Sequence, residues 1–158
     1  MADLHSVVAA GLTERYTTLS AEVHKLAAPL SEDEFWRKPF PFGNSFGHLV
    51  LHLTGNLNYY IGAEIAGTGY VRDRPREFTE TKPPSKEQAL KQFDDAVNVV
   101  LKTIRSQSSE DWGAKYIAKG EEDAETRMTI FLRCVTHLHH HVGQMMYLNY
   151  QLQPETKS

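Results

Sequence analysis

Residues 126–151, TRMTIFLRCVTHLHHHVGQMMYLNYQ, form the stretch of sequence that decides the fold. An apolar residue at every third or fourth position places its side chain on one face of an α-helix. The residues that share such a face here are Ile130, Cys134, His137, His141, Met145 and Leu148. The spacing therefore predicts a helix over 126–151 whose inward face carries two histidines.

Two segments nearer the N-terminus have the same helical spacing. Residues 4–28 carry an apolar stripe that predicts a first helix. A second helix is expected to begin at Asn44 or Ser45, because either side chain can accept a hydrogen bond from a free amide of the first turn. Its apolar pattern continues to about residue 66.

A third helix is predicted after Ser85, which forms a capping-box pattern with Gln88. Its apolar face consists of Ala89, Phe93, Val97, Val100, Leu101 and Ile104. Four long helices with little strand pattern predict an all-α protein, an antiparallel four-helix bundle. Residues 112–123 leave room for a small hairpin.

Prolines and glycines interrupt the helical pattern in two places. Residues 29–44 are therefore expected to form a loop, and residues 67–84 are expected to lack regular helix. The second segment is long for a connection within a bundle, which indicates a functional or mobile role.

Composition limits the classes of protein that fit. The chain has 158 residues, 41% of them hydrophobic, which suits one domain over residues 1–158. The formal net charge of −3 and the lack of a basic stripe argue against nucleic acid as a partner. No apolar run approaches the roughly 20 residues that cross a bilayer. The N-terminal sequence lacks the pattern of a signal peptide, and Cys134 has no second cysteine for an intrachain disulfide, so a cytoplasmic location is expected.

The histidines of the fourth helix are the first candidates for chemistry. His137 and His141 are four positions apart, so their Cβ atoms lie roughly 5–6 Å from each other on one helix face. Both are on the inward stripe, where an unpaired imidazole is costly to bury and needs a hydrogen-bond partner or a metal. His52 follows the inward phase of Leu49 and Asn56 in the second helix and supplies a third candidate ligand.

Three neutral imidazoles leave a divalent ion at least one open position, as in catalytic metal sites. Zinc, nickel and ferrous iron all accept imidazole ligands. The alternative is that these histidines are ordinary surface residues or hydrogen-bonded core residues. His48 and His52 also have a four-residue spacing, but this pair is split across the inward phase, and His48, nearer the helix start, could be a surface residue of the first turn. Leu138 replaces the glutamate of the H-E-x-x-H pattern, which disfavours that class of metallopeptidase.

Two motifs carry a resemblance to a known family. NSFGHLVLHLTGN, residues 44–56, resembles the helix-two motif of DinB-like proteins, and HLHHHVGQ, residues 137–144, resembles their helix-four motif H-x-x-H-H-R-G-Q. Val142 stands where the family has an arginine, so the contacts of that arginine do not carry over. The motifs cover the second and fourth helices.

This resemblance implies a four-helix bundle, often a homodimer, with His52, His137 and His141 as ligands to zinc, nickel or iron. It also implies a small-molecule thiol as partner, because some family members resemble transferases that use bacillithiol or mycothiol. We therefore expect a metal-dependent transferase in which the ion holds a thiol as its thiolate. The alternatives are a metal-dependent hydrolase and a non-catalytic metal-binding or ligand-binding stress protein.

Ligating histidines usually need a hydrogen-bond partner for their second ring nitrogen. Asn56, one turn after His52, and Gln144, one turn after His141, are candidates for this role. His140 is at most an outer neighbour of the site.

Other residues are expected near the same cavity. Tyr60 could face it, and Cys134 is expected to act as a small buried apolar residue. Arg72, Arg74 and Arg76 could hold a carboxylate of a thiol substrate, although a solvated loop is the simpler expectation for them.

Overall fold

The computed structural model describes residues 3–153, and this part of the chain confirms the all-α prediction. The long helices are α1 (Leu4–Ala27), α3 (Phe46–Leu57), which continues as the π-helix η1 (Asn58–Ala63), α5 (Lys86–Ser106) and α7 (Arg127–Leu152). Three short helices lie in the connections: α2 (Glu32–Trp36), α4 (Arg76–Thr79) and α6 (Ser109–Gly113). None of the helices in residues 3–153 combines the length and apolar character that a membrane span needs.

The helix starts follow from capping side chains. Ser45 accepts a hydrogen bond from the amide of His48 at the start of α3. The predicted capping box of Ser85 and Gln88 is confirmed at the start of α5. Thr126 caps α7 in the same way, since its side chain accepts from the amide of Thr129.

Two short helices correct the loop predictions. α2 forms inside the predicted loop 29–44, because Ser31 and Glu34 make a further capping box and Phe35 is buried in the core. α4 forms inside segment 67–84, where Pro75 precedes the first helical residue and therefore costs no internal hydrogen bond. In place of the hairpin considered for residues 112–123, the structure has an isolated antiparallel bridge between Lys115 and Thr126.

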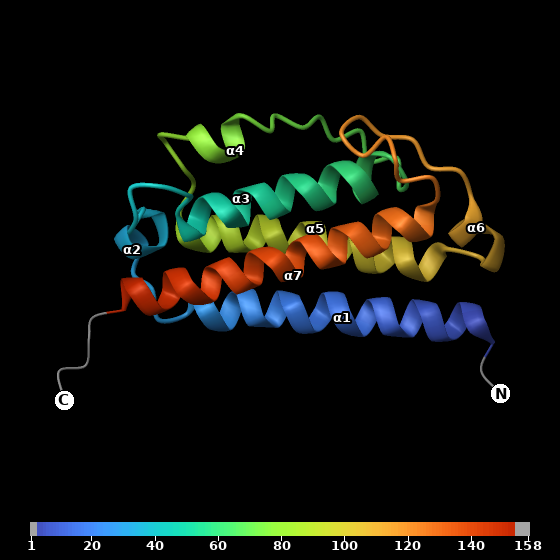
Figure 1. Cartoon of the computed structure of the whole chain (residues 1–158), viewed down its shortest axis with the longest axis horizontal. Helices are drawn as coiled ribbons and strands as arrows, with labels where there is room; N and C mark the ends of the chain where they lie inside the picture. The colour runs from blue at the N-terminus through green and yellow to red at the C-terminus, as the bar shows by residue number, and fades with distance from the viewer. Residues whose placement is uncertain (1–2, 154–158) are drawn as a thin grey trace.

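The expected antiparallel arrangement is observed for only some of the helix pairs. α1 is antiparallel to α5, and α3 is antiparallel to α7, whereas α1 with α7 and α3 with α5 run in the same direction (Figure 1). Hydrogen bonds join Tyr16 to Phe131 and Leu26 to Asn149. Residue numbers therefore increase in the same direction along α1 and α7, which shows that the two helices are parallel. Because α3 and α5 are parallel, residues 64–85 must return along the length of the bundle, which explains the unusual length of this crossover segment.

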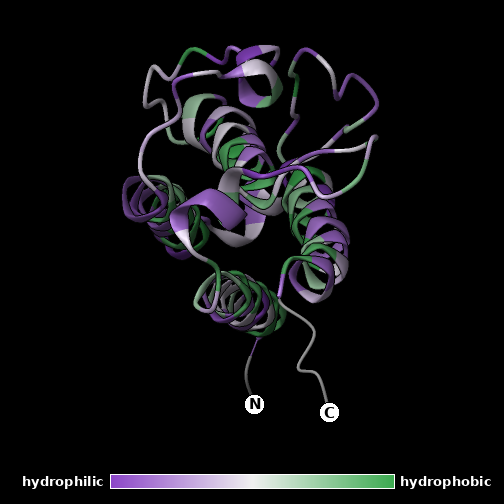
Figure 2. Ribbon diagram, turned by 90° about the vertical axis from the view of Figure 1, so that its left-hand side faces the viewer, coloured by the Kyte–Doolittle hydropathy of each residue, from purple (hydrophilic) through white to green (hydrophobic). Residues whose placement is uncertain are grey.

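The core lies between the four long helices. Its fully buried aromatic side chains are Tyr16, Phe35, Phe46, Phe93 and Phe131. The apolar stripe on α1 was expected to be buried along its whole length. Its first residues are not buried, since Leu4 and Val7 are 78% and 55% exposed. Figure 2 looks along the helices and shows that the crossover segment and the loop before α7 both lie on the α3 side, opposite α1.

The helix that begins at Phe46 changes its hydrogen-bonding pattern before it ends. α3 stops at Leu57, and the π-helical turn continues to Ala63, short of the predicted end near residue 66. The amide of Glu64 donates to the carbonyl of Tyr59 at 3.2 Å, five residues back. π-helical turns are frequent at functional sites. Here the turn carries Tyr59 and Tyr60, which line the cavity described below.

Candidate metal centre

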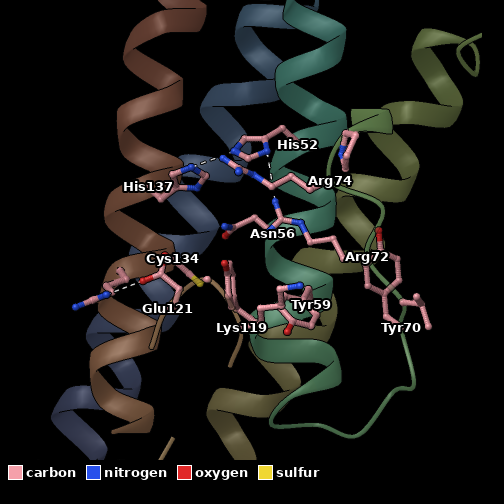
Figure 3. Close-up of a pocket in the computed structure, with 15 residues that line it drawn as sticks. His52, Asn56, Tyr59, Tyr70, Arg72, Arg74, Lys119, Glu121, Cys134 and His137 are labelled. Carbon is pink, nitrogen blue, oxygen red and sulfur yellow. Dashed lines mark hydrogen bonds and ion pairs between the residues drawn. The ribbon is translucent and has the colours of Figure 1, made fainter. Parts of the chain in front are cut away.

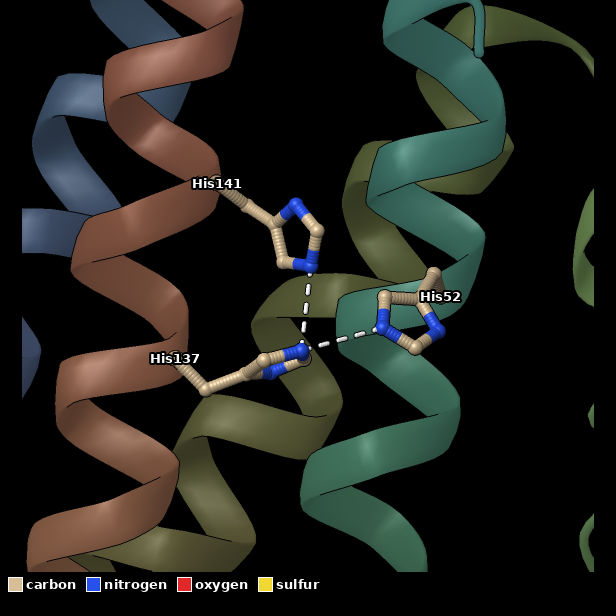
Figure 4. Close-up of side chains that lie close together, drawn as sticks. All are labelled: His52, His137 and His141. Carbon is tan, nitrogen blue, oxygen red and sulfur yellow. Dashed lines mark hydrogen bonds between the residues drawn. The ribbon is translucent and has the colours of Figure 1, made fainter. Parts of the chain in front are cut away.

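Three histidine side chains converge between α3 and α7 (Figure 4). His52 comes from α3, while His137 and His141 lie one turn apart on α7. The Nε2 atom of His137 is 3.1 Å from Nε2 of His52 and 3.0 Å from Nε2 of His141. One nitrogen from each ring lies within 4.8 Å of the others, so a single ion could contact all three.

Hydrogen bonds set the orientation of two of the rings. His52 Nδ1 is 2.8 Å from Oε2 of Glu77, and His141 Nδ1 is 2.7 Å from Oε1 of Gln144. Both oxygens accept, so each Nδ1 carries the proton and each Nε2 keeps its lone pair. The lone pairs of His52 and His141 are therefore directed into the cluster.

The expectation that Asn56 is the hydrogen-bond partner of His52 is wrong. Glu77, and not Asn56, is the hydrogen-bond partner of His52, and the Oδ1 atom of Asn56 is buried with no partner among residues 3–153. Glu77 is itself held by Arg72, whose Nε and Nη2 atoms are 2.7 and 3.0 Å from its two carboxylate oxygens. The Arg72 side chain is 8% exposed and not solvated as expected, because it forms this buried ion pair.

Gly55 makes the approach of Glu77 possible. A Cβ atom at position 55 would lie 2.0 Å from Oε1 of Glu77, a distance that no side chain can tolerate. The crossover segment can therefore pack on α3 and place its carboxylate against His52 only because residue 55 has no side chain.

The surroundings keep the α7 histidines neutral. Burial, together with the neighbouring His141 and His52, lowers the pKa of His137 to about 3. Burial also lowers the pKa of His141 to about 4, against the opposing effect of its hydrogen bond with Gln144. Both imidazoles are thus unprotonated near pH 7, the form that binds a metal.

This donor set fits a divalent ion. Neutral imidazoles whose lone pairs meet at one point repel one another unless a cation lies between them. The Nε2 atom of His137 lies 3.1 and 3.0 Å from the Nε2 atoms of His52 and His141, and one N–H group can serve only one of these contacts, so hydrogen bonding alone does not account for the cluster. Three imidazole nitrogens suit zinc, nickel or ferrous iron.

A cavity of about 680 Å³ opens beside the cluster (Figure 3). His52 and His137 lie at one end, and Lys119 and Glu121 lie at the other. Gly120 has a φ of +92°, and a Cβ there would be 2.8 Å from the Tyr60 hydroxyl. Glycine therefore lets this loop close over the cavity.

The comparison with known families agrees with the geometry. The model of the DinB superfamily matches residues 15–145, most of the chain. The chain belongs to the DinB superfamily. The matched range includes the three histidines and Glu77, and the resemblance found in the two motifs is confirmed. No curated protein matches the sequence of this DinB-superfamily member.

Other predicted residues of this DinB-superfamily protein lie around the cluster. His140 is exposed, and its Nε2 atom is 3.2 Å from Nε2 of Gln144. Tyr60 and Cys134 line the cavity. Burial raises the pKa of the Cys134 thiol, so this side chain stays protonated and acts as a small apolar residue.

His48 is buried, so the interpretation of it as a surface residue of the first turn is wrong. Its Nδ1 atom is 2.6 Å from the Ser45 hydroxyl, and its Nε2 donates to the carbonyl of Glu80 at 3.2 Å. It is therefore a satisfied structural residue outside the histidine cluster.

The arginines of the crossover segment divide into two groups. Arg72 and Arg74 line the cavity, whereas Arg76 pairs with Glu80 on the surface of the DinB fold. Glu77 could not be predicted from the sequence. Its position two residues after Pro75, beside three arginines, gave no periodic signal.

Proposed function

We propose that this protein is a metal-dependent S-transferase that binds one divalent ion through His52, His137 and His141 and joins a small thiol, through its thiolate sulfur, to an electrophilic substrate. The observation that carries the proposal is the convergence of three imidazole nitrogens at one end of a cavity of about 680 Å³. A site closed on all sides would suit a structural ion, whereas a site that borders a cavity suits a substrate.

Each residue has a defined task in this proposal. Glu77 and Gln144 fix the rings of His52 and His141 with Nε2 directed inward. A bound divalent ion would supply the positive charge that keeps a thiol as the nucleophilic thiolate. The α7 histidines need no deprotonation before they bind an ion, because their pKa values are already low.

Cobalt substitution tests the thiol role. In the cobalt-loaded protein, a small thiol should produce a thiolate-to-metal charge-transfer band, and binding should release a proton. The alanine variants of the three histidines should show neither signal. A wild-type protein that gives no band but hydrolyses an ester or amide would support a metal-dependent hydrolase. Absence of both signals would support a non-catalytic binding protein.

A further inference from the structure

The outward side of α7 is exposed and yet carries no formal charge. Residues 134–152 contain no aspartate, glutamate, lysine or arginine. α3 has no charged residue either, but nearly all of α3 is buried. The exposed sides of α1 and α5, by contrast, carry charged residues such as Glu14 and Lys91. The sequence of α7 therefore has the composition of a helix that is covered on all sides.

Large apolar side chains take the place of charges on this side of α7. Tyr147 and Tyr150 are 77% and 75% exposed, and Leu132 and Met146 are 45% and 41% exposed. Neighbouring apolar side chains that remain exposed often mark an interaction site. The composition of α7 and the exposure of these residues therefore both indicate a binding surface.

The residues along the middle of the outward side follow the spacing of a coiled coil. Steps of four and three residues alternate, which is the period of a helix that packs lengthwise against a second helix. This spacing reads the same from either end, so two copies of α7 that run in opposite directions have matching positions. We name these residues the outer stripe: Leu132, Thr136, His139, Gly143, Met146 and Tyr150.

Gly143, near the middle of the outer stripe, has no explanation within one chain. A Cβ atom there would have no neighbour within 4 Å in the part of the chain described, and the φ of Gly143 is not positive. Glycine inside a helix is less stable than alanine, so this residue costs stability without relieving a contact. The close approach of a second helix to this position would account for it.

Side-chain sizes match when two copies of α7 run antiparallel. Met146 of one copy then meets Thr136 of the other, and His139 meets Gly143, so a larger side chain faces a smaller one in each pair. In a parallel pair each residue would meet its own counterpart. Gly143 would then face Gly143 and leave a gap, so the antiparallel arrangement fills the contact better.

The outer stripe is also compatible with itself in charge. A two-fold dimer uses the same face of both copies, and like charges that meet across such a contact are unfavourable. The stripe has no charged residue that could meet its counterpart. Arg15 lies at its edge, where Nη2 donates to Nδ1 of His139 at 3.3 Å, and a polar rim is usual around protein interfaces.

We infer that the outer stripe of α7 is the docking surface for a second copy of this chain, whose own α7 packs antiparallel to it about a two-fold axis near the middle of the stripe. None of the residues of the outer stripe lines the cavity beside the histidines. The contact therefore leaves both cavities open, and the inference does not depend on the proposed function.

Sedimentation velocity of the metal-loaded protein at a series of concentrations tests the association. The wild type should sediment as a dimer. Gly143→Gln should raise the dissociation constant of the dimer by about tenfold or more, because the new side chain enters the space of His139 from the second copy. Asn98→Gln, at an exposed position of α5, is the matched control and should dimerise as the wild type does.

A pair of opposite charges tests the antiparallel arrangement. Thr136→Glu should weaken the dimer, because it places a charge in the contact. Met146→Lys added to the same chain should restore the dimer, since positions 136 and 146 face each other only when the two helices run in opposite directions. If the double variant dimerises no better than Thr136→Glu alone, the antiparallel arrangement is wrong. Metal content and helical circular dichroism equal to those of the wild type show that each variant is folded.

Two further results would overturn the inference. A wild type that stays monomeric at every concentration would exclude a second copy and would point to a different protein as the occupant of the outer stripe. A dimer that both Gly143→Gln and Thr136→Glu leave intact would place the contact between the copies on another face.

Discussion

The Oε2 atom of Glu77 lies 2.8 Å from Nδ1 of His52, although the two residues are 25 positions apart in the sequence. This contact joins the crossover segment to the histidine cluster. The candidate site is therefore built from α3, α7 and the connection between α3 and α5. A carboxylate behind a ligating histidine fixes the ring and raises its basicity.

Loss of the Glu77 carboxylate should weaken metal binding. Glu77→Ala removes the partner of His52 Nδ1, and we expect metal affinity to fall by about 10-fold to 100-fold. Competition with a chromophoric chelator measures this affinity. Glu80→Gln, a change in the same segment at a residue that pairs with exposed Arg76, is the control and should bind as the wild type does. Unchanged affinity in Glu77→Ala would show that the contact has no effect on the metal.

Gly55→Ala should act on the same contact from α3. Its Cβ would overlap Oε1 of Glu77, so the carboxylate must leave His52 or the segment must shift. We expect the free energy of unfolding to fall by about 1–3 kcal/mol, the usual scale of overpacking, together with a loss of metal affinity. Gly11→Ala in α1 has open space around the new Cβ and should be neutral or stabilising. Equal effects of the two substitutions on metal affinity would contradict the role of Gly55.

Alanine substitutions of the two histidines of α3 should have different effects on metal binding and on stability. His52→Ala should abolish tight metal binding, because two imidazoles remain. His48→Ala should retain the metal but lose stability, by about 1–3 kcal/mol, because buried Ser45 and the Glu80 carbonyl lose their partner. Metal analysis and urea unfolding of both variants measure the difference. A loss of metal in His48→Ala as large as in His52→Ala would place both residues in the site.

The low pKa values of the α7 histidines predict a pH dependence of stability. An unfolded chain takes up protons on both histidines as the pH falls through about 6.5. The folded protein does not do so until pH values near their folded pKa values, about 4 for His141 and about 3 for His137. The metal-free protein should therefore lose stability as the pH falls from about 6.5 towards 4.

Urea unfolding of metal-free protein at a series of pH values measures this loss. His137→Gln removes one titrating group. It should therefore reduce the slope of the free energy of unfolding against pH by up to about 1.4 kcal/mol per pH unit. The same slope in the variant and the wild type would contradict the neutral, buried state of His137.

The sequence predicted the parts of this protein that depend on local periodicity. The stripe on α7 placed His137 and His141 on one face, the phase of α3 brought His52 towards them, and the Ser85 capping box marked the start of α5. Each depends on residues within a few turns of one another, where helical geometry determines which side chains share a face.

Features that depend on long-range packing escaped prediction. Helix periodicity carries no information on direction, so it did not show that α3 and α5 are parallel. Glu77 reaches His52 only after residues 64–85 have returned along the bundle and packed against Gly55. His48 looked exposed near a helix start, but the same segment covers it and supplies the Glu80 carbonyl.

The most direct test is the metal content of protein purified without nickel resin, measured by inductively coupled plasma mass spectrometry for the wild type, His137→Ala and His141→Ala. The wild type should carry about one divalent ion per chain, and each variant should lose it, because two imidazoles are too few for a tight site. If both variants keep the ion at the wild-type ratio, the histidine cluster is not the metal site.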